Sequence, residues 1–224
     1  MARQIVIVCL TLLVGFASAR AQKVKALCNC PQHTMAGIVK GSRANACFNF
    51  PNHRQIIACG YHDTSNHSTL YSEFILTICG DDSVIGFWDA TQICRLTQVK
   101  DTLFVTETKY LPAGPGGAYE RVNWRIEKIW FAKDHRLMRK AGINRTYRKY
   151  SQAQINAALT GFESAQDEGN SMDLANRLFM AAVSGSTRAR EYLKLMTTQA
   201  GASDGAFLEE YKELDAMLEL WNQK

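Results

Sequence analysis

A small group of cysteine and histidine side chains has the residue types that bind transition metals. Cys28 and Cys30 are separated by one residue, and His33 follows three positions later. His62 and His67 lie five positions apart in a second polar stretch. Thiolate and imidazole groups that converge at short spacing are ligands that zinc prefers. A metal-binding exported protein is therefore one hypothesis, with His33, His62 and His67 as candidate ligands.

Disulfide bonds are the alternative use of these cysteines. Of the seven cysteines, Cys9 lies in the apolar N-terminal segment and the other six precede residue 95. These six are Cys28, Cys30, Cys47, Cys59, Cys79 and Cys94. An even number in an exported chain indicates a disulfide framework, and an oxidised cysteine cannot bind metal as a thiolate. We favour disulfide bonds and expect Cys28 and Cys30 to reach different later cysteines, because a bridge between them would close a very tight ring.

A basic segment offers a second kind of chemistry, the binding of anions. Residues 133–150 contain seven Lys or Arg and a single Asp, whereas residues 151–224 contain six bases and eleven acids. We favour docking of the acidic part on the basic part; the alternative partner is a protein or an anionic envelope or extracellular polymer. Export makes nucleic acid a less natural partner. The candidate anion-binding residues are Arg136, Arg139, Lys140, Arg145, Arg148 and Lys149.

Motifs of common enzymes and cofactor sites are missing from the sequence. It has no G-x-S-x-G, H-E-x-x-H, G-x-x-x-x-G-K-[ST] or C-x-x-C pattern, and we expect no cofactor. His62, Asp63 and His67 form the one acid/base cluster that stands out, so a hydrolase without a recognisable motif stays an alternative. Asn66 and Asn144 begin N-glycosylation sequons, which matter only in a host that glycosylates exported proteins.

Residues 1–21 have the composition of a secretory signal peptide. Arg3 supplies positive charge, the apolar run 5–16 follows, and Ala19-Arg20-Ala21 matches the small-residue cleavage pattern. The apolar run is shorter than the roughly 20 residues that a membrane-spanning helix needs. The sequence thus predicts a secreted or periplasmic protein with no membrane span after cleavage, and an uncleaved anchor is the alternative.

The first half of the mature chain shows the alternation of β-strands. Apolar runs at 55–61, 71–79, 84–90, 93–99 and 103–111 recur about every ten residues, which is typical of antiparallel meanders. The runs 71–79 and 84–90 are the most clearly apolar, and we expect them to form the core around an intervening Gly-Asp-Asp-Ser turn. We also expect a short strand at 35–39. Residues 122–131 fit a strand or a helical face, and their tryptophans and β-branched residues favour a strand. We expect Trp88, Trp124 and Trp130 to fill the core of the sheet.

The second half has the composition of helices. Alanine and leucine rise after Ser151, and Ser151 with Gln154 forms a capping box. The pattern predicts helices over 151–165, 171–183, 187–199 and 204–222. In the last of these, apolar residues recur at steps of three and four, at Phe207, Tyr211, Leu214, Leu218 and Trp221.

The sequence therefore predicts an α+β protein. After the signal peptide at 1–21 we expect a disulfide-stapled antiparallel β domain at 22–132, a basic connector at 133–150 and a small α-helical bundle at 151–224. The favoured function is non-catalytic binding by an exported protein. Metal binding and motif-free hydrolysis are the alternatives.

Overall fold

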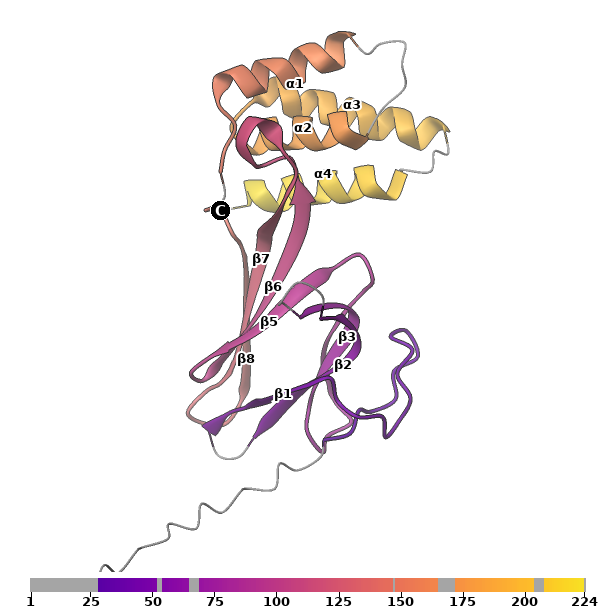
Figure 1. The fold of residues 1–224 in the computed structure, drawn as a ribbon, viewed down its shortest axis with the longest axis vertical. Coiled ribbons are helices and arrows are strands. Elements are labelled where there is room, and N and C mark those ends of the chain that lie inside the picture. The colour runs from indigo at the N-terminus through magenta and orange to yellow at the C-terminus, as the bar shows by residue number, and fades with distance from the viewer. Residues whose placement is uncertain are drawn as a thin grey trace, which may run out of the picture.

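An antiparallel sheet followed by a helical bundle makes up the chain, so the α+β prediction is confirmed (Figure 1). The computed structural model describes residues 28–51, 54–64, 69–146, 148–164, 172–203 and 208–223, with the backbone alone over 199–203. The signal segment 1–21, Asn66 and His67 lie outside the described residues. No helix in the described part of the chain combines the length and apolar composition needed to cross a membrane.

Eight strands form the sheet, in the order β1-β2-β3-β5-β6-β7-β8, with β4 paired to β3 beside β5. The strands are β1 (Ala46–Asn49), β2 (Gln55–Asp63), β3 (Leu70–Ile78), β4 (Val84–Trp88), β5 (Ile93–Val99), β6 (Thr102–Leu111), β7 (Glu120–Phe131) and β8 (Leu137–Ile143). Every pairing is antiparallel. The ambiguous run 122–131 is a strand, as expected.

The structure differs from the sequence prediction at three places, one of which is β1, in a stretch with no predicted strand. Residues 137–143, expected within a connector, form β8, which pairs with β7 along its whole length. A turn joins the two strands, and the Ala132 amide donates to the Arg136 carbonyl across it. The expected strand at 35–39 is instead a turn closed by a bridge between His33 and Ile38.

The apolar inner face of the sheet encloses the first core. The ring planes of Phe74 and Trp88 stack with centroids 4.9 Å apart, which places the expected strand pair β3–β4 at its centre. Gly60 allows β2 and β3 to approach closely, because a Cβ there would lie 2.4 Å from the Glu73 carbonyl oxygen and φ is +141°. β2 and β3 are therefore in contact at a point where only glycine fits.

Two disulfide bonds hold the N-terminal arm, residues 28–43, against the sheet. Cys28 pairs with Cys79 and Cys30 pairs with Cys59, so each of the first two cysteines reaches a different later one, as expected. Buried side chains from the arm, β2 and β3 form a second small core around these bridges. The two β-bridges of the arm lie within it, so the disulfides are the covalent links that fix its position on the sheet.

Cys47 and Cys94 were expected in the same framework but belong to neither bridge. Cys47 lies on β1 and Cys94 on β5, and β2 and β3 run between these strands. Three strand spacings amount to about 14 Å, whereas a disulfide needs Cα atoms within about 7 Å. Cys94 is buried, and desolvation followed by the charge of Glu107 raises the pKa of its thiol.

Four helices cap one end of the sheet: α1 (Gln152–Ser164), α2 (Met172–Val183), α3 (Thr187–Ser203) and α4 (Leu208–Asn222). The first two match the predicted ranges to within one residue, and α3 runs four residues beyond its predicted end. The predicted start of the last helix, at 204–207, lies outside the described residues. The capping box is present, because the Ser151 amide donates to Gln154 Oε1 at 3.1 Å and the Gln154 amide donates to Ser151 Oγ at 3.4 Å. Tyr211, Leu214 and Leu218 of α4 are buried as the helical pattern predicts.

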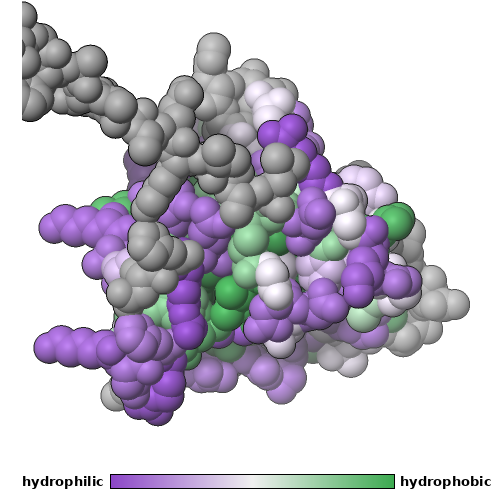
Figure 2. Space-filling model, turned by 90° about the horizontal axis from the view of Figure 1, so that it is seen from below, coloured by the Kyte–Doolittle hydropathy of each residue, from purple (hydrophilic) through white to green (hydrophobic). Residues whose placement is uncertain are grey.

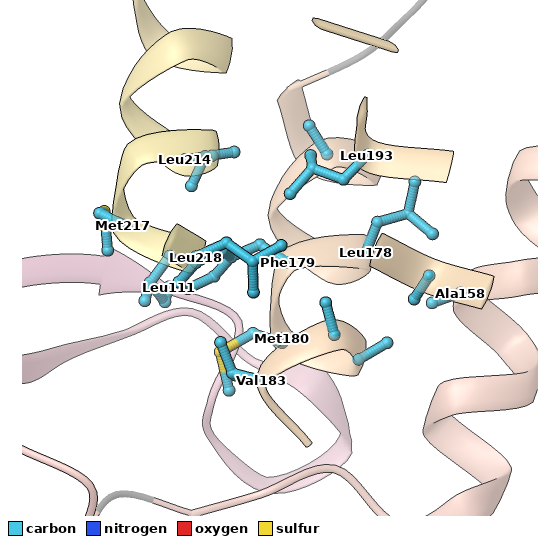
Figure 3. Packing of buried hydrophobic residues seen from close by; sticks show 14 of the residues in the cluster. Leu111, Ala158, Leu178, Phe179, Met180, Val183, Leu193, Leu214, Met217 and Leu218 are labelled. Atoms are coloured by element: carbon cyan, nitrogen blue, oxygen red, sulfur yellow. The ribbon is translucent and has the colours of Figure 1, made fainter. Parts of the chain in front are cut away.

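The helical core includes residues from the sheet. Leu111, at the end of β6, lies beside Leu218 of α4 and Phe179 of α2 (Figure 3). Trp124 of β7 is 1% exposed, and its ring centroid lies 5.5 Å from that of Phe179 and 5.9 Å from that of Trp221. The long hairpin β6–β7 thus reaches into the bundle and joins the two halves (Figure 1). At the opposite end of the molecule the described surface is mainly hydrophilic, with hydrophobic side chains visible mostly in a recess near its middle (Figure 2).

Tyr150 ties the entrance of α1 to the loop between β6 and β7. Its hydroxyl donates to the Pro112 carbonyl at 2.9 Å, and its amide donates to Ser184 Oγ at 2.8 Å. The side chain is buried in the helical core. Burial raises the pKa of Tyr150 to about 12.

Stability should fall as the pH rises from about 10 to about 12. The unfolded phenol ionises near pH 10, whereas the folded phenol keeps its proton until about pH 12. The stabilisation is complete below the unfolded pKa and is lost as the pH rises through the folded one, because the unfolded state releases its proton first. Urea unfolding at about pH 8 and about pH 11 tests this. Tyr150→Phe should lose less stability over that interval, and equal losses in both proteins would contradict the assignment.

Candidate binding site

One edge of strand β8 has backbone groups with no strand partner among the described residues. β8 is the last strand of the sheet in the described part of the chain, and it lies at the margin of the ribbon (Figure 1). The Asn144 amide donates to the Trp124 carbonyl, and in an antiparallel ladder such inward-bonded residues alternate with outward-facing ones. Lys140 and Gly142 therefore turn their backbone toward β7. Ala141 and Ile143 turn theirs to the open side.

An inner cavity of about 430 Å³ lies on the helix side of this edge. Its lining residues are Arg125, Ala141, Gly142, Ile143, Arg145, Leu220 and Gln223. Arg145 donates to the Trp221 carbonyl at 2.7 Å and also to the Gln223 carbonyl, and its guanidinium lies 5.3 Å from the centroid of the Trp221 ring. A cation at the C-terminus of a helix satisfies its last carbonyl groups and interacts favourably with its dipole. Arg145 therefore fastens the end of α4 to the wall of the cavity.

An outer cavity of about 370 Å³ lies on the other face of the same edge. Its lining residues are Ile126, Lys128, Lys140, Ala141, Gly142, Ile143, Asn144, Arg145 and Thr146. Lys128 and Lys140 are direct cross-strand partners, and like charges placed so are destabilising. Among the described residues, neither lysine has an acidic side chain within 4.0 Å. The cavity thus holds positive charge that no described carboxylate neutralises.

The candidate anion-binding residues separate into three groups in the structure. Lys140 and Arg145 line the cavities. Arg139 faces inward, donates to Glu127 at 2.6 Å and to the Ile85 carbonyl, and Arg136 pairs with Asp134 at 2.6 Å in the β7–β8 turn. The exposed pair Arg148 and Lys149 follows the edge without lining either cavity.

Two basic residues of the site, Arg125 and Lys128, were not predicted from the sequence. Both belong to β7, and they join the site through their register with β8, Arg125 opposite Ile143 and Lys128 opposite Lys140. Recognising 137–143 as a strand paired to 122–131 would have placed them. That strand has no apolar alternation, and its cations placed it in the basic segment 133–150 instead.

Docking of the acidic helices uses a residue outside the basic segment. Lys109 of β6 forms an ion pair with Glu213 of α4 and lies 3.5 Å from Glu107, which is 8% exposed. Along β6 these charges lie between Val105 of the sheet core and Leu111 of the helical core. Within 133–150, Arg145 contacts α4 through backbone carbonyls rather than carboxylates. The basic edge therefore keeps charge available for a ligand.

The candidate metal ligands that the structure describes, His33 and His62, do not converge with other ligands. His33 Nδ1 accepts from the Ala36 amide at 3.2 Å, and its neighbours Cys28 and Cys30 are oxidised. His62 is exposed at the end of β2, where its Nδ1 lies 3.0 Å from Asn45 Nδ2. Across the residues that the structure describes, no three His, Cys, Asp or Glu side chains form a group that could hold a metal ion. A site that includes His67 stays a prediction.

Comparison with known proteins gives no functional assignment. No protein-family model matches the chain, and searches of curated proteins and of solved structures found no match. The chain folds as a disulfide-linked α+β protein, and the open edge of its sheet at β8 is basic.

Proposed function

We propose that this is an exported, non-catalytic binding protein that holds an anionic ligand along the β8 edge. The observation that carries the proposal is the facing pair Lys128 and Lys140 in an open cavity with no acidic partner among the described residues. Two like charges in register lower the stability of the sheet by up to about 1 kcal/mol, and an anion between them would reverse that effect. The ligand would neutralise the two positive charges of Lys128 and Lys140, which have no acidic partner among the described residues.

Two independent features support the proposal that the protein is exported. The N-terminal segment has the pattern of a secretory signal. Cys28–Cys79 and Cys30–Cys59 are disulfide bonds, which persist in oxidising compartments and are rare in the cytosol. Both point to a secreted or periplasmic protein, where an acidic protein segment or an envelope or extracellular polymer would be the available anion.

Charge reversal at the cavity should remove binding. With labelled poly-glutamate as the probe, Lys128→Glu combined with Lys140→Glu should weaken affinity at least tenfold, because two charge-assisted contacts become repulsive. Fluorescence anisotropy at low salt measures the affinity, and added salt should weaken it in the wild-type protein because exposed charges are screened.

Arg148→Glu combined with Lys149→Glu is the matched control. It changes the net charge of the protein equally, but neither residue lines either cavity. It should lower affinity by no more than about threefold through the general field of the protein. Equal losses in the two double variants, or no loss in the first, would show that the cavity is not the binding site.

A further inference from the structure

We infer that the anionic ligand is an acidic polypeptide segment that adds to the sheet as a further strand beside β8. This inference rests on the proposed function and names its ligand class. β-Strand addition needs an open edge with outward backbone groups and pockets for alternate side chains. The β8 edge has both.

The backbone of the edge provides the first requirement. Ala141 and Ile143 direct their N–H and C=O groups away from β7, and no described strand lies beyond them. These two residues are about 6.8 Å apart along the strand, which is the repeat at which an antiparallel neighbour exchanges paired hydrogen bonds. An added segment would satisfy groups that now face solvent.

The two cavities provide the second requirement. They lie on opposite faces of β8 and share the residues Ala141, Gly142, Ile143 and Arg145 as a common wall. Successive side chains of an added strand point to opposite faces. One set would enter the inner cavity beside Arg125, and the other would enter the outer cavity beside Lys128 and Lys140. A segment with acidic residues would therefore meet cations on both faces.

Protection of the edge is uneven along β8. Sheet edges are commonly protected by charged side chains, proline, bulges or covering loops. At the lower end, Arg139 crosses to the Ile85 carbonyl of β4 and Leu137 packs on the sheet core. At the upper end, Ala141 is exposed and a Cβ on Gly142 would find no atom within 4 Å. The open part of the edge thus coincides with the cavities.

A second copy of the chain is a poor occupant. β8 has the sequence LMRKAGI, with two cations and no acid. Pairing two such edges would bring a second Lys128 and Lys140 toward the first pair with nothing to offset them, and like charges across strands are unfavourable. An acidic segment supplies the complementary charge.

Backbone pairing can be tested separately from charge. Ala141→Pro removes an outward N–H and leaves the β7–β8 ladder intact, and proline is tolerated at edge positions of this kind. The probe is a nine-residue peptide of alternating Glu and Thr. Ala141→Pro should weaken its binding at least tenfold, whereas the matched Ala141→Val, which retains the N–H but adds bulk to the cavity wall, should weaken it by less than about threefold. Circular dichroism of both variants checks folding.

Two further probes separate failure of this inference from failure of the proposed function. The same peptide with alternate amides N-methylated should bind the wild-type protein at least tenfold more weakly, without any change to the protein. Polyphosphate should bind wild type and Ala141→Pro equally. If Ala141→Pro and the methylated peptide both leave affinity unchanged while Lys128→Glu/Lys140→Glu abolishes it, the site binds anions without strand addition. If the charge variant also binds normally, the proposed function fails.

Discussion

Removing the disulfide between Cys28 and Cys79 is expected to lower the free energy of unfolding by about 4 kcal/mol. The bridge closes a loop with a sequence separation of 51 residues, and the chain-entropy estimate for a loop of this length is about 4 kcal/mol. The second bridge, Cys30–Cys59, spans 29 residues, for which the estimate is about 3.5 kcal/mol. The two loops overlap, so their effects should not add in full.

Few other contacts hold the arm in place. Both of its β-bridges, Asn29–Arg43 and His33–Ile38, join the arm to itself. Its side-chain contacts with the rest of the described chain include the exposed ion pair Lys40–Asp82 and the ring contact of His33 with Phe87. The small core beneath it is built around the disulfides themselves. Without them the arm would leave Ile57 and Ile75, both fully buried, in contact with water. Loss of the bridge therefore also costs apolar burial.

Urea unfolding of Cys28→Ala/Cys79→Ala against the wild-type protein measures this effect. Addition of a reductant should destabilise the wild-type protein more than the variant, because only one bridge remains to be reduced in the latter. A loss below about 1 kcal/mol would mean that the arm contributes little to the stability of the sheet.

Patterns with a single strong period led to correct predictions of the fold. The runs that became β2 to β7 are apolar segments separated by turns, with alternation clearest along β6 and β7. The helices begin and end within about four residues of the predicted limits. These elements bury one face against a core, so the period is visible in their residues. The capping box at Ser151 was similarly local, requiring only two side chains three residues apart.

Edge strands have too little hydrophobic periodicity to be predicted from the sequence. β8 buries little of either face, and its central residues are Arg139, Lys140 and Ala141, so no apolar alternation marks it. β1 has four residues, too few to establish a period. The candidate site lies at β8, and its residues Arg125 and Lys128 come from the neighbouring strand. Charge counting found Lys140 and Arg145, but the site could be assembled only from the register between strands.

Contacts between residues far apart in the sequence could not be predicted either. Sequence composition favoured disulfides, yet the choice among six cysteines depends on strand order, which separates Cys47 from Cys94. The docking of α4 through Lys109 and Glu213 likewise joins residues 104 positions apart. Of the tryptophans expected in the core, Trp88 and Trp124 are buried, whereas Trp130 is half-buried, and Trp124 belongs to the helical core rather than to that of the sheet.

Trp124→Ala is expected to cost about 3–5 kcal/mol, since this is the usual range for removal of a fully buried large aromatic side chain. Trp124 is 1% exposed and packs on Phe179 of α2 and Trp221 of α4. Trp124→Phe is the matched control, because it keeps a ring in the same place and should lose less than half as much. Urea unfolding followed by circular dichroism measures both. A loss under about 1 kcal/mol would show that the bundle holds together without the β6–β7 hairpin.

Trp124→Ala should also affect the binding edge at β8, because Trp124 stacks on Trp221, which contacts Arg145. Trp221 lies between Trp124 and the guanidinium of Arg145, which is 5.3 Å from its centroid. Arg145 lines both cavities, so its position depends on where α4 ends. Below the urea transition, Trp124→Ala should therefore weaken poly-glutamate binding by about threefold to tenfold, whereas Trp124→Phe should leave it nearly unchanged. Unchanged affinity in the alanine variant would mean that the basic edge is positioned by β7 and β8 alone.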